Sequence, residues 1–331
     1  MIPPSYERVD YRIRPAKSVE RKMFCEAFVK LERFCDLTEY KYVGMGSIFF
    51  SDFALMHKSL GIKDFINIED KEKDRKRFEF NCPYKFIKLL FGKSNDILPN
   101  KINWSKKLIL WLDYDYKLDE SVFRDISIFL LKAKSGSIIL LTIDVDPDDP
   151  KDEKTGEHVG RYDKLVNRIG ESNIPRGTEE KDLLDSKDCQ KVCFEVINNV
   201  INRMISIRNG CIGEDDKLEY KQLFNFLYKD GSAQMLTIGG IIYSQKDKNK
   251  IQKCNFDKLD FIKSGRDAKP YKIDVPILTF KEKCYLDKIL PIDKSSGKKT
   301  KDDLSFLSKK IKENYSKIHR YFPSFVEAEI R

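Results

Sequence analysis

Two short stretches of the chain carry residue types that could hold a nucleoside. Residues 42–47 (YVGMGS) have the pattern of a buried strand that runs into a glycine turn, and residues 65–69 (FINIE) have the pattern of a strand that ends in a carboxylate. Glycines at a strand tip let a ligand lie against the backbone, and an acid at the next tip accepts hydrogen bonds from ribose hydroxyls. The spacing therefore predicts an adenosine-containing cofactor at Gly44, Gly46 and Glu69.

The glycine spacing narrows the choice of cofactor. A dinucleotide fingerprint, G-x-G-x-x-G, would need glycine at position 49, where this chain has Phe49. The P-loop pattern G-x-x-x-x-G-K-S/T is also missing from this turn. A turn of this kind is less adapted to a pyrophosphate at a helix N-terminus. The pattern therefore favours S-adenosylmethionine, which has no phosphate, over NAD or ATP.

Polar side chains also stand after the next two expected strands. Asn95 and Asp96 lie in the turn after residues 86–91, where a Rossmann-type sheet places a polar group against the adenine amine. Asp113 follows the expected strand at residues 108–112. Ligands of parallel sheets bind at the carboxyl ends of the strands, so we expect Asp113 to face the same cleft and predict it as the catalytic residue.

Asp113 has a second interpretation, as a metal ligand. Asp113 and Asp115 stand two residues apart at one strand end, and Asp144 ends the following expected strand. Three carboxylates on neighbouring strand tips could bind Mg²⁺. In the alternative, Asp113 meets the cofactor and Asp115 caps the next helix.

A basic cluster precedes the first expected strand. Arg14 and Lys17 either belong to a solvated helix start or anchor an anion, which would be the carboxylate of the cofactor or an anionic acceptor. No general base accompanies them. The three histidines lie in the helix after the glycine turn, in a polar insertion and near the C-terminus: His57, His158 and His319.

Strand and helix patterns alternate over the first half of the chain. Strands are expected from residue 42 onward and at 65–68, 86–91, 108–112 and 137–143. Helices are expected at 17–35, 52–60, 71–80 and 122–133. We predict Ser18 as the N-cap of the first helix and Gly61 as the residue that ends the second. The alternation predicts an α/β, Rossmann-like, mostly parallel sheet with helices on both faces.

Changes in composition divide the chain into five parts. We predict an N-terminal helical cap (1–40), a Rossmann cofactor-binding half (41–145), a polar insertion or lid (146–190), the remainder of the sheet (191–262) and a C-terminal mixed or helical extension (263–331). Within the fourth part, residues 233–243 look like two short strands around a Gly-Gly kink.

Length and composition bound the class of protein. The chain has 331 residues, a net charge of +9, 41% hydrophobic residues and eight cysteines without a CxxC pair. Its mean hydropathy is −0.50. We therefore expect a soluble cytoplasmic protein with reduced thiols, no membrane span and no secretion signal. The modest positive charge permits a nucleic-acid partner, but no recognition motif indicates one.

These motifs together resemble the class I S-adenosylmethionine-dependent methyltransferases. More narrowly, the chain looks like a bacterial family labelled as O-methyltransferases. The resemblance covers most of residues 10–145 and returns in the second half of the chain. It rests on residues 11–22 (YRIRPAKSVERK), 42–47 (YVGMGS), 50–53 (FSDF), 66–69 (INIE), 77–81 (RFEFN), 111–115 (WLDYD), 235–240 (MLTIGG) and 275–279 (VPILT).

The resemblance implies a role for each strand tip. Gly44, Gly46 and Ser47 would approach the methionine part of S-adenosylmethionine, and Glu69 would take the ribose hydroxyls. Asn95 or Asp96 would meet the adenine, and Asp113 would lie beside the sulfonium or the acceptor. Residues 235–243 would supply the C-terminal antiparallel hairpin of a methyltransferase sheet. The chain departs from the family pattern in one respect, because two glycines stand where three are usual.

Functions from different classes stay open at this point. The favoured hypothesis is an S-adenosylmethionine-dependent methyltransferase of unknown acceptor, with residues 146–190 and the C-terminal third shaping acceptor access. The alternative is a catalytically silent Rossmann module that binds a nucleotide-like ligand or a protein partner in a bacterial defence assembly, because no base stands out. A metal-dependent nuclease that uses the three aspartates is less favoured, since no Lys or His joins them in a known spacing.

Overall fold

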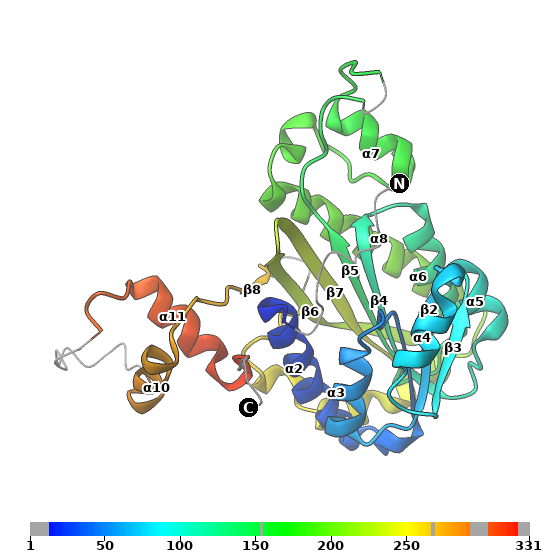
Figure 1. The fold of residues 1–331 in the computed structure, drawn as a ribbon. Helices are drawn as coiled ribbons and strands as arrows, with labels where there is room; N and C mark the ends of the chain where they lie inside the picture. The colour runs from blue at the N-terminus through cyan, green and yellow to red at the C-terminus, as the bar shows by residue number, and fades with distance from the viewer. Residues whose placement is uncertain (1–12, 153–154, 266–268, 292–303, 324–331) are drawn as a thin grey trace.

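An eight-stranded mixed sheet with helices on both faces runs through the protein (Figure 1). The computed structural model describes residues 13–152, 155–265, 269–291 and 304–323. The strands are β1 (Tyr40–Gly44), β2 (Asp64–Glu69), β3 (Ile87–Phe91), β4 (Lys107–Lys117), β5 (Ile138–Asp144), β6 (Leu218–Asp230), β7 (Ala233–Ser244) and β8 (Tyr271–Ile273). The helices are α2 (Pro15–Val29), α3 (Ser51–Leu60), α4 (Arg75–Asn81), α5 (Ser94–Lys101), α6 (Glu120–Lys132), α7 (Arg161–Ile169), α8 (Ser186–Asn209), α9 (Lys248–Lys253), α10 (Phe280–Lys288) and α11 (Lys309–Ile318).

The strand order is β3-β2-β1-β4-β5-β7-β6-β8. Strands β1 to β5 pair in parallel, whereas β7 is antiparallel to both β5 and β6. Parallel strands end at one edge, and the register places Gly44 opposite Trp111 and Glu69 opposite Phe91. The predicted Rossmann-like class with a C-terminal antiparallel hairpin is confirmed, and the glycine turn, Glu69 and Asp113 share one edge.

Alternation along the strands divides the core into two layers. Tyr42 and Trp111 belong to the buried cluster that includes α2 and α3. Val43 and Leu110 belong to the cluster on the other face, which includes α6 and α8. In Figure 1, α2 and α3 lie in front of the sheet, with α8 behind it. The layer with α2 therefore carries the side chains that reach the carboxyl edge from the front.

Helix α2 begins earlier than the sequence predicted. Its first residue is Pro15 with Arg14 as N-cap, so the prediction of Ser18 as N-cap is wrong. Proline is favoured at the first helical position because its fixed φ suits the helix and its missing N–H would have no partner there. The earlier start places Lys17 and Glu20 within the first two turns, where they face the sheet. Gly61 ends α3 with φ 70°, as predicted.

The hairpin differs from the predicted pair of short strands around a kink. Strand β7 is continuous, and Gly239 and Gly240 lie inside it. A Cβ at Gly239 would lie 2.4 Å from the Ile139 carbonyl oxygen, and one at Gly240 would lie 2.3 Å from that of Lys221. The two glycines thus allow close strand approach on both sides of β7. The partner strand β6, with Phe224 and Phe226 in the core, carries the other half of the hairpin.

The inserted and C-terminal segments pack onto this framework in different ways. In the insertion, Leu165 and Ile169 of α7 are buried in the same cluster as α8. The C-terminal helices enclose a small cluster of their own, with Leu286 and Tyr315, to the side of the sheet (Figure 1). No helix among the described residues has the length and apolar character needed to span a membrane.

Candidate active site at the carboxyl edge

The turn after β1 has an uncommon backbone conformation. Ser47 and Phe50 have φ values of 48° and 47°, and Asn255 is the only other described non-glycine residue with positive φ. Such conformations cost about 1–3 kcal/mol each and persist where surrounding contacts impose them, often at functional sites. The Gly46 N–H donates to Oδ1 of Asn67 at 2.7 Å, which ties the turn to β2.

Aromatic packing explains why positions 44 and 46 are glycine. A Cβ at Gly46 would lie 2.5 Å from the ring of Phe53, and one at Gly44 would lie 2.9 Å from the ring of Tyr42. The rings of Phe53 and Tyr42 therefore occupy the space that a side chain at position 46 or 44 would need. The predicted contacts of Gly44, Gly46 and Ser47 with a cofactor stay predictions, since this packing alone requires the two glycines.

A small hollow, partly open to solvent, adjoins this turn. Helices α2 and α3, the glycine turn and the middle of β4 form its walls. Its lining consists of Lys17, Arg21, Met45, Gly46, Ser51, Asp52, Trp111 and Asp113. Arg21 and Asp52 thus face one small volume, next to the ion pair of Lys17 and Asp113. Such a lining suits a ligand that carries both charges, because each charge finds an opposite partner.

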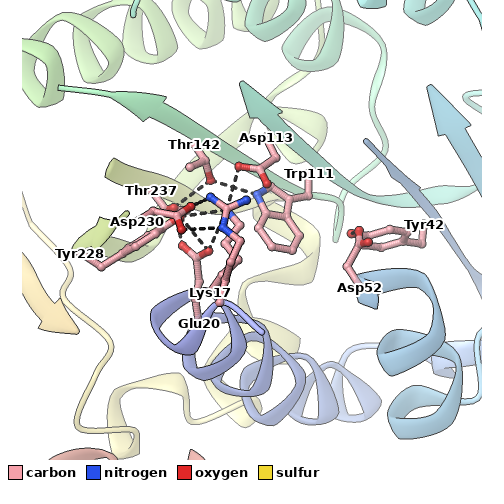
Figure 2. Close-up of polar contacts among 11 residues, drawn as sticks. Lys17, Glu20, Tyr42, Asp52, Trp111, Asp113, Thr142, Tyr228, Asp230 and Thr237 are labelled. Atoms are coloured by element: carbon pink, nitrogen blue, oxygen red, sulfur yellow. Dashed lines mark hydrogen bonds and ion pairs between the residues drawn. The ribbon is translucent and has the colours of Figure 1, made fainter. Parts of the chain in front are cut away.

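Lys17 makes three polar contacts beside this hollow (Figure 2). Its ammonium donates to Asp113 Oδ1 at 2.7 Å and to the Tyr228 hydroxyl at 2.8 Å, and it lies 3.1 Å from Glu20 Oε2. The ammonium also lies 4.7 Å from the centre of the Trp111 ring, a cation–π contact. The side chain is only 2% exposed, so its charge is neutralised by protein groups.

Glu20 ends a hydrogen-bonded chain that crosses the sheet (Figure 2). The Trp111 indole N–H donates to Thr142 Oγ1 at 3.0 Å, and the Thr142 and Thr237 hydroxyls lie 2.8 Å apart. Thr237 in turn donates to Glu20, as does the Tyr228 hydroxyl at 3.1 Å. Complete burial raises the pKa of Glu20, and Lys17 and the Thr237 hydrogen bond oppose that shift. The chain links α2 to β4, β5, β6 and β7.

Asp52 forms a second buried acidic group on the other side of the hollow. Its Oδ2 accepts a 2.6 Å hydrogen bond from the Tyr42 hydroxyl, and the two side chains lie apart from the Lys17 network in Figure 2. Burial raises the pKa of Asp52, while Tyr42 and the positive charge of Arg21 oppose the shift. Sequence reasoning did not choose Asp52 or Arg21 as site residues, although Arg21 belongs to the basic cluster of Arg14 and Lys17. Their signal was their place in the quoted motifs FSDF and SVERK, next to the residues that were chosen.

Glu69 stands at the end of β2, half-buried at the same edge. Its Oε1 accepts a hydrogen bond from the Lys71 N–H at 2.9 Å. Burial raises the pKa of Glu69 to about 7, against the opposing effect of that hydrogen bond, and the neighbouring Asp70 adds to the increase. Ligand hydroxyls that donate hydrogen bonds to this carboxylate would stabilise its ionised form and lower its pKa.

The two predicted adenine contacts differ in their surroundings. Asn95 Nδ2 donates to Ser121 O at 2.9 Å and to Asp125 Oδ1 at 2.6 Å, so its amide nitrogen is directed to α6. Asp96 is exposed. Both lie in α5, which begins at Ser94, so the turn predicted over residues 92–96 becomes a helix after two residues. Which of the two meets an adenine stays a prediction.

The predicted anion anchors both have protein partners. Arg14 forms an ion pair with Asp230 at the end of β6, and Lys17 is bound as described above. The structure brings Lys17, Asp113 and the glycine turn together at one hollow. It places Arg14 with Asp230 instead, and Arg21 is the second cation that lines the hollow.

The carboxylates of the predicted magnesium site do not converge. Asp113 bonds to Lys17, Asp115 is exposed, and Asp144 accepts from the Asp146 N–H at 2.7 Å and lies 3.6 Å from Lys117 Nζ. Among the described residues, no group of three or more His, Cys, Asp or Glu side chains could hold a metal ion. The arrangement therefore does not support a Mg²⁺ site at Asp113, Asp115 and Asp144.

The sheet order and the antiparallel β6–β7 pair define a Rossmann-like methyltransferase fold. The chain belongs to the family described as "Putative O-methyltransferase", whose family model matches residues 9–330. The protein is thus a methyltransferase, and the resemblance drawn from its motifs is confirmed. Among curated proteins, no sequence relative was found.

Comparison with solved structures found matches of low similarity. The O-methyltransferase TomG from Streptomyces achromogenes, in complex with SAM, has 10% identity and a TM-score of 0.33, over 65% of this chain and 78% of that one. An O-methyltransferase from Bacillus cereus in complex with SAH has 12% identity and a TM-score of 0.33, over 65% and 79%. Trm1 from Pyrococcus horikoshii with S-adenosyl-L-methionine has 10% identity and a TM-score of 0.42, over 76% and 61%. At such scores, the family match and the strand order define the class.

Proposed function

We propose that the chain transfers a methyl group from S-adenosylmethionine to an acceptor that bears a hydroxyl or amine hydrogen. The observation that carries the proposal is the hollow beside the turn after β1 and the middle of β4, where Arg21 and Asp52 face one volume next to the Lys17–Asp113 ion pair. An α-amino acid carries one ammonium and one carboxylate, so its two charges match this mixed lining.

Two observations at the strand ends fit the binding of this cofactor. The buried amide nitrogen of Asn67 has no hydrogen-bond partner among the described residues, although its Oδ1 holds Gly46. Glu69 presents a half-buried carboxyl at the next strand end. We assign the ribose to Glu69 and the amino acid end to the hollow, with Arg21 toward the carboxylate and Asp52 toward the ammonium.

When bound, S-adenosylmethionine supplies a methyl group on a sulfonium, which an acceptor must approach in line. The chain's own residues would direct this approach. Trp111 and Met45 supply apolar walls beside the charged groups. Asp113 has one oxygen bonded to Lys17, and its side chain remains 21% exposed at the hollow. Its second oxygen can accept the hydrogen of the acceptor hydroxyl or amine, which orients the nucleophile.

The three histidines do not supply a base at this hollow. The ring of His57 contacts the Ile62 carbonyl oxygen and packs on Tyr84 and Phe86, and His319 contacts the Ser316 carbonyl oxygen. His158 lies in the insertion and does not line the hollow. The silent-module alternative was motivated by the same lack of a base, but methyl transfer needs positioning more than proton removal. No feature of the described residues favours that alternative.

Two ligands of different length test the placement by calorimetry. S-adenosylhomocysteine carries the amino acid, whereas 5′-methylthioadenosine lacks it. We expect Arg21→Met to weaken S-adenosylhomocysteine at least tenfold and to leave 5′-methylthioadenosine within twofold, because a charge-assisted hydrogen bond contributes about 1.5–3 kcal/mol. Glu69→Gln should weaken both ligands. Lys58→Met, an exposed lysine on α3, is the control variant and should change neither.

The outcomes separate placement from function. If the wild-type chain binds neither ligand at millimolar concentration and gains no thermal stability from them, the proposed function is wrong. If it binds both, but Arg21→Met weakens both equally, the amino acid end does not lie in the hollow. Thermal unfolding without ligand shows whether each variant is folded.

A further inference from the structure

The three hydrogens of the Lys17 ammonium all have acceptors on the protein. They point to Asp113 on β4, to the hydroxyl of Tyr228 on β6 and to Glu20 one turn along α2. An ammonium has three donors and no acceptor, so this set leaves none for a ligand. Lys17 can therefore neither grip a carboxylate nor act as a base without losing one of these contacts.

Asp113 is fixed from one side only. Its Oδ1 is held by Lys17, while its side chain is 21% exposed and lines the hollow together with Trp111. Lys17 itself is 2% exposed and Glu20 is fully buried. The ion pair thus connects a ligand-facing carboxylate to a core network. The direction of the free Asp113 oxygen depends on where α2 holds Lys17.

A buried network of charged groups often stabilises a fold less than apolar packing would. Two charges removed from water lose hydration that their attraction restores only with good geometry, and apolar side chains of similar volume often give equal or greater stability. The position between α2 and the sheet is otherwise filled by aromatic residues, such as Phe24 against Trp111 and Phe226. A structural role alone would be met by another apolar residue at position 17.

We propose that Lys17 is a positioning residue, which directs the second carboxylate oxygen of Asp113 toward the sulfonium of the bound methyl donor. The proposal rests on the proposed function and deepens it, since it assigns the negative charge opposite the reacting sulfur to Asp113. Lys17 acts through Asp113 and does not touch the ligand.

The ratio of affinities for two ligands tests this assignment. S-adenosylmethionine and S-adenosylhomocysteine differ by the methyl group and the positive charge on sulfur, so their relative affinity reports the charge near that atom. We expect Asp113→Asn to lower the preference for S-adenosylmethionine about tenfold. Lys17→Met should lower it by a similar factor, because Asp113 is no longer held in place. A purely electrostatic role of Lys17 gives the opposite sign, since loss of a positive charge favours the cationic ligand.

A double-mutant cycle shows whether Lys17 acts through Asp113. In the Asp113→Asn background, Lys17→Met should cause no further change in the ratio, because the group it positions is already altered. A Lys17→Arg variant, which keeps a donor toward Asp113, should restore part of the ratio. If Lys17→Met does not fold, the same cycle is run with Glu20→Gln throughout. The amide oxygen still accepts from Thr237, the amide nitrogen can donate to the Tyr228 hydroxyl, and no second unpaired charge remains.

Three results would overturn the proposal. In the first, the ratio in Lys17→Met is unchanged or rises. In the second, Lys17→Met changes the ratio equally in the wild-type and the Asp113→Asn backgrounds. In both cases the wild-type chain still binds the two ligands, so the proposed function stands while the role of Lys17 falls. If the wild-type chain binds neither ligand, the proposed function and this inference fail together. Lys106→Met, on the surface near Asp64, is the control and should leave the ratio unchanged.

Discussion

The two ends of the candidate site are built in different ways. Near β1 and β4, charged side chains from distant segments hold one another: Lys17 reaches Asp113 and Tyr228, and both partners lie more than 90 positions away in the chain. Near β2 and β3, contacts are local, and the carboxyl of Glu69 accepts from the N–H of Lys71 two residues later. The first end is buried, and the second is half-exposed.

This difference separates a preorganised region from one that a ligand completes. Groups held by a buried network keep their geometry without a ligand, and their removal acts on the stability of the whole fold. Groups with local contacts and partial exposure contribute less to stability, and their removal acts mainly on binding. Substitutions at the first end should therefore change unfolding, and those at the second end should change affinity.

The largest effect is expected from Lys17→Met. It leaves Glu20 buried without its cation, and removal of one partner of a buried ion pair costs about 3–5 kcal/mol. We expect the free energy of unfolding in urea to fall by that amount. The control is Lys106→Met, whose pair with Asp64 is exposed at the surface and should contribute at most about 1 kcal/mol. Equal losses in the two variants would contradict the preorganised character of the first end.

The next effect is expected from Gly46→Ala. The added Cβ would lie 2.5 Å from the Phe53 ring, so the ring or the turn must move, which typically costs about 1–3 kcal/mol. Gly213→Ala is the control, because nothing lies within 4 Å of a Cβ at that position. Urea unfolding of the two variants gives the comparison. A Gly46→Ala variant as stable as the control would mean that the turn is loose in solution.

Sequence patterns predicted the parallel strands β1 to β5 better than the antiparallel hairpin of β6 and β7. Local signals were sufficient to locate β1 to β5, because each contains apolar residues near polar ones, but they did not show that β4 continues to Lys117. Strand β6 was not predicted, although Phe224, Phe226 and Tyr228 alternate into the core. Gly239 and Gly240 were misinterpreted as a kink, because a glycine that permits close strand approach and a glycine that breaks a strand look alike without the neighbouring strands.

The chemistry of the site divides along the same line. Glu69 could be chosen because it ends β2, and Asp113 because it follows the apolar run of β4, although β4 continues past the predicted strand end to Lys117. The partners of Lys17 outside α2 could not be inferred, because they come from two other elements, β4 and β6, and depend on how α2 lies across the sheet. The sequence offered Arg14 and Lys17 as anion anchors, but no local pattern shows that Asp230 and Asp113 neutralise them.

A third effect concerns the pH dependence of ligand binding at Glu69. Its pKa is raised to about 7 in the unliganded fold, chiefly by burial. The folded state thus holds the proton more tightly than the unfolded chain does, and the stability contributed by this group is lost as the pH rises through about 7. Ribose hydroxyls that donate to the carboxylate favour its ionised form. Affinity for S-adenosylhomocysteine should therefore fall below pH 7, at most tenfold per pH unit.

Calorimetry in two buffers of different ionisation enthalpy measures the same linkage directly. Near pH 6, binding should release protons in the wild-type chain and release none from this group in Glu69→Gln. That variant should bind more weakly above pH 7 but show a flat pH profile between pH 6 and 7. A wild-type affinity that does not change over this range would mean that the ligand does not meet Glu69.

The smallest effects distinguish Asn95 from Asp96, the two residues offered for the adenine. Asn95→Ala removes hydrogen bonds to Asp125 and to the Ser121 carbonyl oxygen, so stability should fall by about 1 kcal/mol. Asp96→Ala alters an exposed side chain, so its stability should stay within about 0.5 kcal/mol of wild type.

If Asp96 accepts from the adenine amine, its alanine variant weakens 5′-methylthioadenosine severalfold while its melting curve stays in place. If the affinity changes only with Asn95→Ala, in step with the loss of stability, α5 supports the site without contacting the ligand. That result would mean that the adenine end is preorganised by protein contacts. Glu69 would then be the one predicted contact in the region that a ligand completes.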